Sequence, residues 1–275
     1  MNGQSIRPAS APGGVRGHVS VRRAARVVLP VAAFAAILLL WQSGVFNRLF
    51  NLPDYTVPRP SVIASTLHSN WSGIWSAQWM TLTEAVIGYV IGGVLGFASA
   101  VAVAMTGIGG RLVPGLAGAV NALPIVALAP IAVLDLGYGA SSKIAVVTLL
   151  TGAVMALNAC KGLTSVAGDP LHLMYSYAAS RWQILTKLRV MHALPYVFTA
   201  LKYNVTIALV AAIIAEFFGA YGGVGPEMVQ ALQAFAMPLA WSVMVVVGVV
   251  GILWYEALVG LERLCLGWHS SYRQS

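Results

Sequence analysis

Charged residues are scarce in this sequence. They make up only 9% of the 275 residues, whereas soluble domains usually carry about a quarter. Hydrophobic residues make up 59% of the chain. This composition supplies too little polar surface to cover a water-soluble globule, so we expect lipid to surround most of the chain.

Motifs for catalysis and cofactor binding are also missing. The sequence contains no G-x-x-x-x-G-K-[ST] phosphate loop, no G-x-S-x-G and no H-E-x-x-H. The five histidines form no i, i+4 pair, and the two cysteines, Cys160 and Cys265, lack metal-ligand spacing. We therefore expect no catalytic residue, bound cofactor or metal in this chain, which argues against an enzyme.

The net charge of +8 does not indicate a nucleic-acid partner. The basic residues lie in short segments between long apolar stretches, an arrangement typical of the cytoplasmic side of membrane proteins. No basic groove interleaved with aromatic residues is visible, so nucleic acid is excluded as the expected partner and the lipid bilayer is favoured.

Six segments are long and apolar enough to cross a bilayer, which takes about 20 residues. They are 27–49, 81–105, 112–135, 141–163, 195–218 and 238–262. The sequence therefore predicts an all-α polytopic membrane protein with about six transmembrane helices. We expect a disordered cytoplasmic tail over 1–26, a transmembrane domain over 27–265 and a second cytoplasmic tail over 266–275.

Two of these segments have distinctive patterns. The third contains Pro114, Pro124 and Pro130, and a helix so interrupted survives in a membrane only when protein or a water-filled path surrounds it. The second carries Gly88, Gly92 and Gly96 at a spacing of four, which predicts a seam where another helix approaches closely.

The basic residues also predict the orientation. With a cytoplasmic N-terminus and six spans, three basic residues fall outside, namely Arg48, Arg59 and Lys143. Twelve fall inside, namely Arg7, Arg16, Arg22, Arg23, Arg26, Arg111, Lys161, Arg181, Lys187, Arg189, Arg263 and Arg273. This bias predicts that both termini and the loop 164–194 are cytoplasmic, in a multi-pass protein of the cell membrane.

The loop 164–194 has the pattern of a helix–turn–helix elbow. Asp169-Pro170 is typical of an N-cap followed by proline in the first turn. Ser180 and Gln183 form an S-x-x-Q capping box that begins a second helix. An elbow projecting from the cytoplasmic face would suit docking into a soluble partner, and the alternative is an interfacial loop resting on lipid.

The elbow resembles the cytoplasmic loop of binding-protein-dependent ABC-transporter permeases, in particular the nitrate, sulfonate and taurine permease group. The resemblance rests on Asp169-Pro170, on Ala178-Ala179-Ser180-Arg181-Trp182-Gln183 and on Leu194-Pro195. Two further stretches match in the same order. They are Ala129-Pro130 with Leu136-Gly137-Tyr138-Gly139 and Ser142-Lys143, and Ala215-Glu216 with Gly219-Ala220 and Gly223-Val224-Gly225.

The chain departs from the group's loop at several positions. The group's glutamate falls at His172, its two alanines at Leu173 and Met174, and its glycine at Ala178. Because His172 is mostly neutral near pH 7, an ion pair made by the glutamate is lost. We expect a more aromatic contact through Tyr175, Tyr177 and Trp182.

The resemblance implies an assembly. Two permease subunits, as a homodimer or a heterodimer, would form the path, and two ABC ATPase subunits would bind ATP and Mg²⁺. An extracytoplasmic solute-binding protein would deliver a small organic or anionic solute, either similar to a sulfonate, taurine or nitrate or a small heterocycle. The residues implied in coupling to the ATPase are Asp169, His172, Tyr175, Tyr177, Ala178, Ser180, Arg181, Trp182 and Gln183.

Polar residues inside membrane spans are functional candidates because burying them in lipid is costly. Asp135 and Glu216 lie near the expected external ends of two spans and are candidates for the mouth of the translocation path. Asn158 and Asn204 lie within spans, where helix–helix contact and path lining are alternatives. Lys202 is expected to extend toward the cytoplasmic interface.

Two other functions compete with an ABC permease. A secondary transporter predicts an inverted repeat and a charge relay at mid-membrane, and neither is visible in the sequence. A membrane scaffold without transport activity leaves the elbow unexplained.

Overall fold

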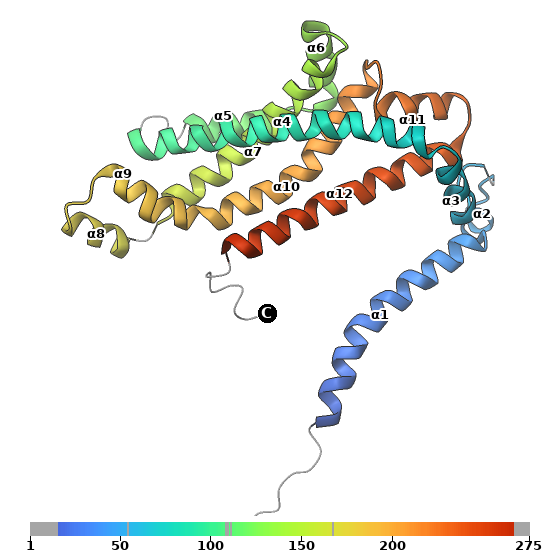
Figure 1. Cartoon of the computed structure of the whole chain (residues 1–275), viewed down its shortest axis with the longest axis horizontal. Helices are drawn as coiled ribbons and strands as arrows, with labels where there is room; N and C mark the ends of the chain where they lie inside the picture. The colour runs from blue at the N-terminus through green and yellow to red at the C-terminus, as the bar shows by residue number, and fades with distance from the viewer. Residues whose placement is uncertain (1–15, 54, 108–109, 111, 167, 267–275) are drawn as a thin grey trace, which may run out of the picture. The chain divides into compact units, whose positions relative to one another are not determined.

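The computed structural model describes residues 16–53, 55–107, 110, 112–166 and 168–266, and helices are the regular elements in this part of the chain (Figure 1). The helices are α1 (Arg16–Gln42), α2 (Val45–Leu49), α3 (Pro60–Ser69), α4 (Trp71–Thr106), α5 (Leu112–Asn121), α6 (Ile125–Leu136), α7 (Ala140–Thr164), α8 (Gly168–Ser176), α9 (Arg181–Ile184), a π-helical turn η1 (Leu185–Arg189), α10 (Val190–Phe217), α11 (Val224–Gln233) and α12 (Met237–Leu266).

The chain divides into two compact units, residues 1–62 and 63–275. In the first unit, α1 begins at Arg16, so residues 16–26, for which we predicted a disordered tail, are helical. Alanine and arginine favour helix, so the helix formed by the apolar segment continues toward the N-terminus through these residues. The rest of the predicted tail, 1–15, and the C-terminal tail from 267 onward lie outside the described residues. The Gln42 amide holds the start of α3 by exchanging hydrogen bonds with the hydroxyl (3.0 Å) and backbone N–H (3.1 Å) of Ser61.

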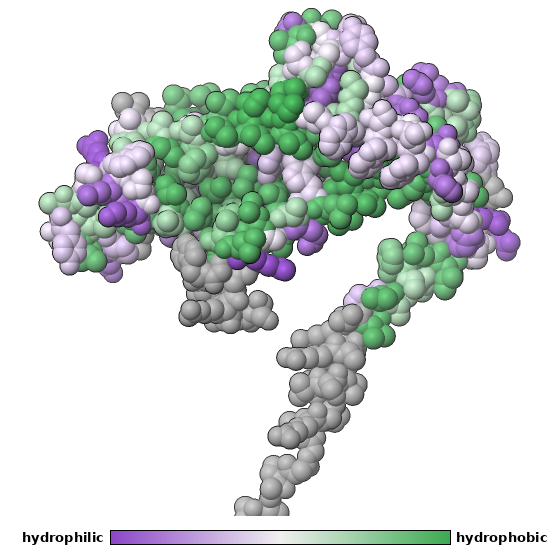
Figure 2. All heavy atoms as spheres, in the orientation of Figure 1, coloured by the Kyte–Doolittle hydropathy of each residue, from purple (hydrophilic) through white to green (hydrophobic). Residues whose placement is uncertain are grey.

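In the second unit, four helical segments are long and apolar enough to span a membrane: Trp71–Thr106, Ala140–Thr164, Arg181–Phe217 and Met237–Leu266. A fifth candidate span is a bent pair of helices, in which α5 and α6 meet at 95°. The pair replaces the single third span that we predicted. Helix α5 ends at Asn121, and Pro124, whose backbone is extended, is the N-cap of α6. Figure 2 shows that hydrophobic residues dominate the visible middle of this bundle, with hydrophilic residues toward its ends.

The long helix α7 lies at the centre of the bundle. It packs most extensively against α4 and α10, and α5 and α6 also contact it. Small residues such as Ala85, Ala129, Ala208 and Ala212 fill the core between these helices and are fully buried. Large apolar side chains on α4 and α12, including Leu95 and Ile252, face outward instead, as expected of a surface in contact with lipid.

Two helix boundaries differ from the sequence-based prediction. The second span begins at Trp71 rather than at 81. Pro195, which we expected to open the fifth span, lies inside α10, and the helix runs without a break from Arg181 to Phe217. Gly162 on α7 lets this region approach closely, because a β-carbon there would lie 2.9 Å from Cα of Ala193. The close contact with α7 therefore lies two residues before the proline.

Candidate functional site

The elbow consists of α8, a short turn, and α9, and it lies at one end of the bundle in Figure 1. Helix α8 begins at Gly168, one residue before the expected cap at Asp169. Two crossed backbone hydrogen bonds end it: the N–H of Ala178 donates to the carbonyl of Tyr175 (2.9 Å) and that of Ala179 to Met174 (3.1 Å). This is the Schellman arrangement of a helix C-terminus.

Ala178 adopts the left-handed conformation that this arrangement requires, with φ of +50°. A β-carbon disfavours this conformation by about 1–2 kcal/mol, which explains why glycine is the usual residue at such a position. Ala178 is also where the resembling permeases carry their glycine. Although this chain has alanine instead of glycine at position 178, the backbone of the turn keeps the left-handed conformation that glycine favours.

The second helix of the elbow begins with the predicted capping box. The N–H of Gln183 donates to Oγ of Ser180 (3.3 Å), and the N–H of Ser180 donates to Oε1 of Gln183 (2.8 Å). The turn is thus fixed at both ends by local hydrogen bonds. It presents its apolar side chains to the outside: Tyr177 is 77% and Trp182 63% exposed.

The other predicted coupling residues share this exposure. Asp169, His172, Tyr175 and Arg181 are all exposed, and none of the described residues forms an ion pair with them. Ile184 and Leu185, which follow directly in the chain, are buried. The elbow is therefore anchored at its base, and its tip is exposed.

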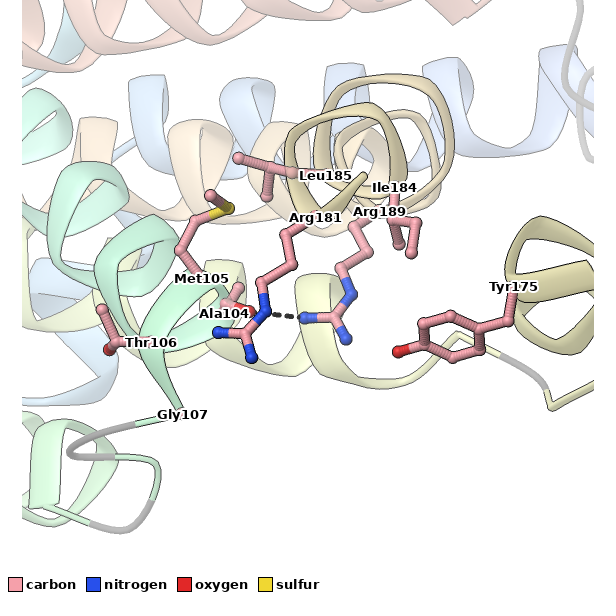
Figure 3. Close-up of a pocket in the computed structure, with 9 residues that line it drawn as sticks. All are labelled: Ala104, Met105, Thr106, Gly107, Tyr175, Arg181, Ile184, Leu185 and Arg189. Atoms are coloured by element: carbon pink, nitrogen blue, oxygen red, sulfur yellow. Dashed lines mark hydrogen bonds between the residues drawn. The ribbon is translucent and has the colours of Figure 1, made fainter. Parts of the chain in front are cut away.

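A pocket of about 250 Å³ lies between the elbow and the end of α4 (Figure 3). Its wall contains the segment from Ala104 to Gly107, together with Tyr175, Arg181 and Arg189. Nη1 of Arg189 donates a hydrogen bond of 2.7 Å to the carbonyl of Ala104. Sequence analysis did not select Arg189, because a lone arginine in a basic loop carries no pattern of its own.

At the opposite end of the bundle, Glu216 is buried among hydrogen-bond donors. Its Oε1 accepts from the Thr81 hydroxyl (2.6 Å) and its Oε2 from the N–H of Gly225 (2.8 Å), while the N–H of Val224 donates to Oγ1 of Thr81 (2.9 Å). Glu216 is only 1% exposed. The residue thus ties α4 and the first turn of α11 to the end of α10, next to a surface pocket of about 240 Å³ that it lines together with Phe218 and Gln230.

Lys143 is buried at the same end, although we predicted it as a charge in an external loop. Its ammonium donates to the carbonyls of Tyr138 (2.6 Å), Gly139 (3.1 Å) and Gly219 (2.6 Å). Lys143 thereby joins two of the stretches that carried the family resemblance, since Tyr138-Gly139 belong to one and Gly219 to the other. Sequence reasoning missed this role because it assigned Lys143 by position alone.

Two other buried side chains near this end have incomplete hydrogen bonding. Both amide atoms of Gln78 and Oε2 of Glu84 are buried and have no partner among the described residues. Both side chains come from α4, on the part of the helix that also carries Thr81. This end of the bundle is therefore unusually polar for the interior of a membrane domain.

The remaining predicted path residues are separated by the fold. Asp135 is exposed near the end of α6. Asn204 is fully buried and donates to the carbonyl of Thr151 on α7 (2.9 Å), so it makes a helix–helix contact. Asn158 instead borders a half-open cavity of about 570 Å³, together with Asn121 and Tyr203. Of the four candidates, Asn158 and Glu216 thus border cavities, at different ends of the bundle.

The three glycines of the predicted seam lie against α7. A β-carbon on Gly88 would lie 2.6 Å from Cβ of Val147, one on Gly92 2.5 Å from the carbonyl oxygen of Thr148, and one on Gly96 2.9 Å from Cβ of Met155. These separations are shorter than van der Waals contact. The backbones of α4 and α7 can therefore approach this closely only with glycine at these positions.

Comparisons with known proteins agree with this architecture. Residues 92–261 match the family described as "Binding-protein-dependent transport system inner membrane component". The formylaminopyrimidine transport permease protein ThiX of Halalkalibacterium halodurans is 34% identical over 53% of this chain and 58% of its own length. The riboflavin transport system permease protein RibX of Chloroflexus aurantiacus is 30% identical over 58% of this chain and 59% of its own length. The chain thus spans somewhat more than half of each of these relatives.

The fold also has a counterpart among solved structures. An inward-facing conformation of the MetNI methionine ABC transporter contains a chain that superposes with a TM-score of 0.59 at 19% identity, covering 68% of this chain and 93% of that one. At this identity the likeness concerns the fold alone. The family match extends over more than half of the chain and includes the elbow, the buried Glu216 and Lys143. The chain belongs to the family of inner membrane components of binding-protein-dependent transport systems.

Proposed function

We propose that this chain is the membrane-spanning permease subunit of an ATP-driven importer. The observation that carries the proposal is the elbow, a locally rigid helix–turn–helix whose exposed tip holds Tyr177 and Trp182. A fixed turn with exposed aromatic side chains is suited to protein recognition, because buried aromatic anchors dominate binding energy at interfaces. The exposed tip is continuous in sequence with the transmembrane helix α10, so a force on it reaches the bundle.

The partners in this proposal follow the family. ABC ATPase subunits bind ATP and Mg²⁺ and dock on the elbow, while this chain holds neither ligand. A second permease subunit, identical or different, completes the path, and an extracytoplasmic solute-binding protein delivers the solute. Closure of the ATPases moves the elbow, and the continuous helix from Arg181 to Phe217 transmits that movement to the opposite end of the bundle.

The proposed orientation has the elbow and both termini in the cytoplasm of a cell-membrane protein. The bias of basic residues supports it. Ser72 and Ser165 offer a matched test because both are exposed and lie near opposite ends of the bundle. A cysteine at 72 should react with an impermeant maleimide in intact cells and a cysteine at 165 should not. The reverse pattern would contradict the orientation and the docking together.

We further propose that the solute moves along the wall formed by Asn121, Asn158 and Tyr203. The wall offers two carboxamides and a phenol among apolar residues, a combination suited to orienting a small polar molecule. None of the described residues that line this cavity is cationic. Lys143 is held by carbonyl oxygens, and Lys202 is paired with Glu262, so neither charge is free for an anion.

The cavity therefore favours a small neutral organic solute over the anionic alternative, because an anion in a low-dielectric path needs a compensating charge. The names of the two relatives, which refer to formylaminopyrimidine and riboflavin, agree with a nitrogen heterocycle. A secondary transporter or a scaffold remains the competing function, and both differ from an importer in needing no ATPase.

Replacing Trp182 by alanine tests the proposed function. We expect the ATPase to co-purify less with the Trp182→Ala variant and solute uptake to fall with it, because the exposed indole is the largest anchor on the elbow. Trp79→Ala is a matched control, since Trp79 is 59% exposed but lies near the start of α4. Normal assembly and uptake in the Trp182 variant would show that the elbow is not the docking element.

A further inference from the structure

The pocket at the base of the elbow has the chemistry of an anion site. Arg181 from α9 and Arg189 from η1 extend their guanidinium groups into the same space, and the hydroxyl of Tyr175 is directed toward it from α8 (Figure 3). None of the described lining residues is acidic. Two cations and a hydroxyl therefore converge on about 250 Å³ without a countercharge.

The two arginines differ in their attachment. Arg189 is half-buried and fixed by its hydrogen bond of 2.7 Å to the carbonyl of Ala104. That carbonyl lies in the last turn of α4, where free carbonyls and the helix dipole favour a cation. Arg181 is exposed and has no hydrogen bond or ion pair to any described residue. Its donors are therefore available to a ligand.

A guanidinium group binds carboxylate with two parallel hydrogen bonds, which makes arginine the usual partner of acidic groups at interfaces. The charge of the surrounding segment points the same way. Between 164 and 194 the sequence holds one acidic residue, Asp169, against Arg181, Lys187 and Arg189. A partner surface complementary to this segment is acidic.

The pocket is also continuous with the exposed aromatic surface of the elbow, because Tyr175 belongs to both. A protein that covers Tyr177 and Trp182 therefore comes within reach of the pocket. We propose that the pocket receives an acidic side chain, Asp or Glu, from the ATPase subunit that docks on the elbow. This inference rests on the proposed function and adds the chemistry of the contact.

The proposal has a mechanical consequence. A carboxylate held by Arg181 and Arg189 connects the partner to α9 and, through the Ala104 carbonyl, to the end of α4. Helix α4 packs along most of α7. Movement of the partner thus reaches the bundle by two routes, through α10 directly and through α4 by way of this pocket. The charge of the contact is also the opposite of one made by a glutamate at position 172, because here the permease supplies the cation.

The test measures the affinity of the purified ATPase for the full-length permease in nanodiscs of phosphatidylcholine. We expect Arg181→Gln to weaken binding by about tenfold and to reduce its salt dependence, because exposed charge pairs are screened by salt. Arg181→Lys should lose part of the affinity, since lysine keeps the charge but not the fork. Lys187→Gln is the control, as Lys187 is an exposed cation of the same segment that does not line the pocket.

Restoration by charge exchange completes the test. Binding lost in Arg181→Glu should return when one acidic residue of the ATPase groove is changed to arginine. Equal effects of Arg181→Gln and Lys187→Gln, or no effect of either, would overturn the proposal. So would an effect of Arg181→Gln that requires phosphatidylglycerol in the nanodisc, because the pocket would then hold a lipid phosphate. Loss of docking in Trp182→Ala with normal docking in Arg181→Gln would reject the pocket alone and leave the proposed function intact.

Discussion

Lys202 and Glu262 form an ion pair of 2.6 Å that joins α10 to α12. The lysine was expected to reach toward the interface by itself, and Glu262 was not among the polar residues that sequence analysis selected. The side chains are 21% and 7% exposed, respectively. Helix α12 otherwise has few buried side chains, namely Ala240, Ser242, Val243, Val246 and Leu266. The pair is therefore a specific attachment for a helix with few buried contacts.

Breaking this pair should loosen α12. We expect Glu262→Gln to lower the free energy of unfolding by about 1–2 kcal/mol, between the values typical of exposed and of fully buried pairs. The exchanged variant Lys202→Glu with Glu262→Lys should recover most of the loss, because it restores opposite charges. Thermal unfolding in detergent micelles measures both. Additive losses in the exchanged variant would show that the two side chains act independently.

The glycine seam gives a prediction with a control one residue away. Gly92→Ala should lower the free energy of unfolding by about 1–3 kcal/mol, the usual cost of overpacking, because its methyl group would lie 2.5 Å from the carbonyl oxygen of Thr148. Gly93→Ala should be neutral or slightly stabilising, because nothing lies within 4 Å of a β-carbon there. Similar unfolding temperatures for the two variants would contradict the close approach of α4 and α7.

The turn of the elbow offers an opposite case, in which glycine should help. Ala178 has φ of +50°, so Ala178→Gly removes the strain of a β-carbon in the left-handed region at the cost of greater freedom in the unfolded chain. In this variant we expect slower hydrogen exchange of the backbone amides at positions 178 and 179, which donate the two hydrogen bonds of the turn. Ala179 does not have a positive φ, so glycine relieves no strain there. Ala179→Gly should therefore speed the exchange of the same amides. Faster exchange in both variants would place the turn outside the Schellman arrangement.

Local patterns in the sequence were sufficient for the elbow and for four of the six predicted spans. The third predicted span is a bent pair, and in the first, 27–49, the apolar helix Val28–Gln42 is shorter than a membrane span. The Ser180–Gln183 capping box depends on residues three apart, and the Gly88–Gly92–Gly96 spacing requires only that the segment be helical. Such features are encoded within one element, so they can be predicted before the fold is known. The assignment to the permease family also came from the sequence, through the elbow and its two companion stretches.

Features that depend on distant residues could not be predicted in this way. Lys143 is buried because the carbonyl of Gly219 comes from a turn 76 residues away. Pro195 lies within a continuous helix that packs against Gly162 of α7 at Ala193, a neighbour that the sequence does not show. The 95° bend between α5 and α6 was expected only as an irregularity, since the prolines indicate a break but not its angle. In each case, the deciding contact is tertiary.

The removal of the Lys143 ammonium tests whether the two companion stretches form one structural unit. Lys143→Met keeps the apolar stem but leaves three carbonyls without their donor, so we expect a loss of about 2–4 kcal/mol in the free energy of unfolding. Lys143→Arg should lose less because it retains a charged donor. Limited proteolysis near Tyr138 and Gly219 should increase in the methionine variant at both turns together. Cleavage at one turn alone would show that the lysine does not hold them jointly.

The cavity bordered by Asn158 and Tyr203 gives the most direct test of the proposed path. Replacing Asn158 by leucine keeps the side chain's size but removes both of its hydrogen-bonding groups, so a polar solute that meets this wall loses a partner while remaining desolvated. We expect uptake by the reconstituted importer to fall about tenfold, as is typical when a buried polar group of the solute is left unpaired. The ATPase activity that does not depend on solute should be unchanged, because the elbow is intact.

Tyr203→Phe should reduce uptake less, by a few-fold, since it removes one hydroxyl and leaves the ring. Tyr255→Phe is its matched control, because Tyr255 is a partly exposed tyrosine on α12 that does not line the cavity.

Asn158→Lys separates the two classes of solute: an added cation should lower uptake of a neutral heterocycle and should raise it if the solute is an anion. Unchanged uptake in both Asn158 variants would mean that the solute passes elsewhere, and the wall would then be a packing surface for the second permease subunit.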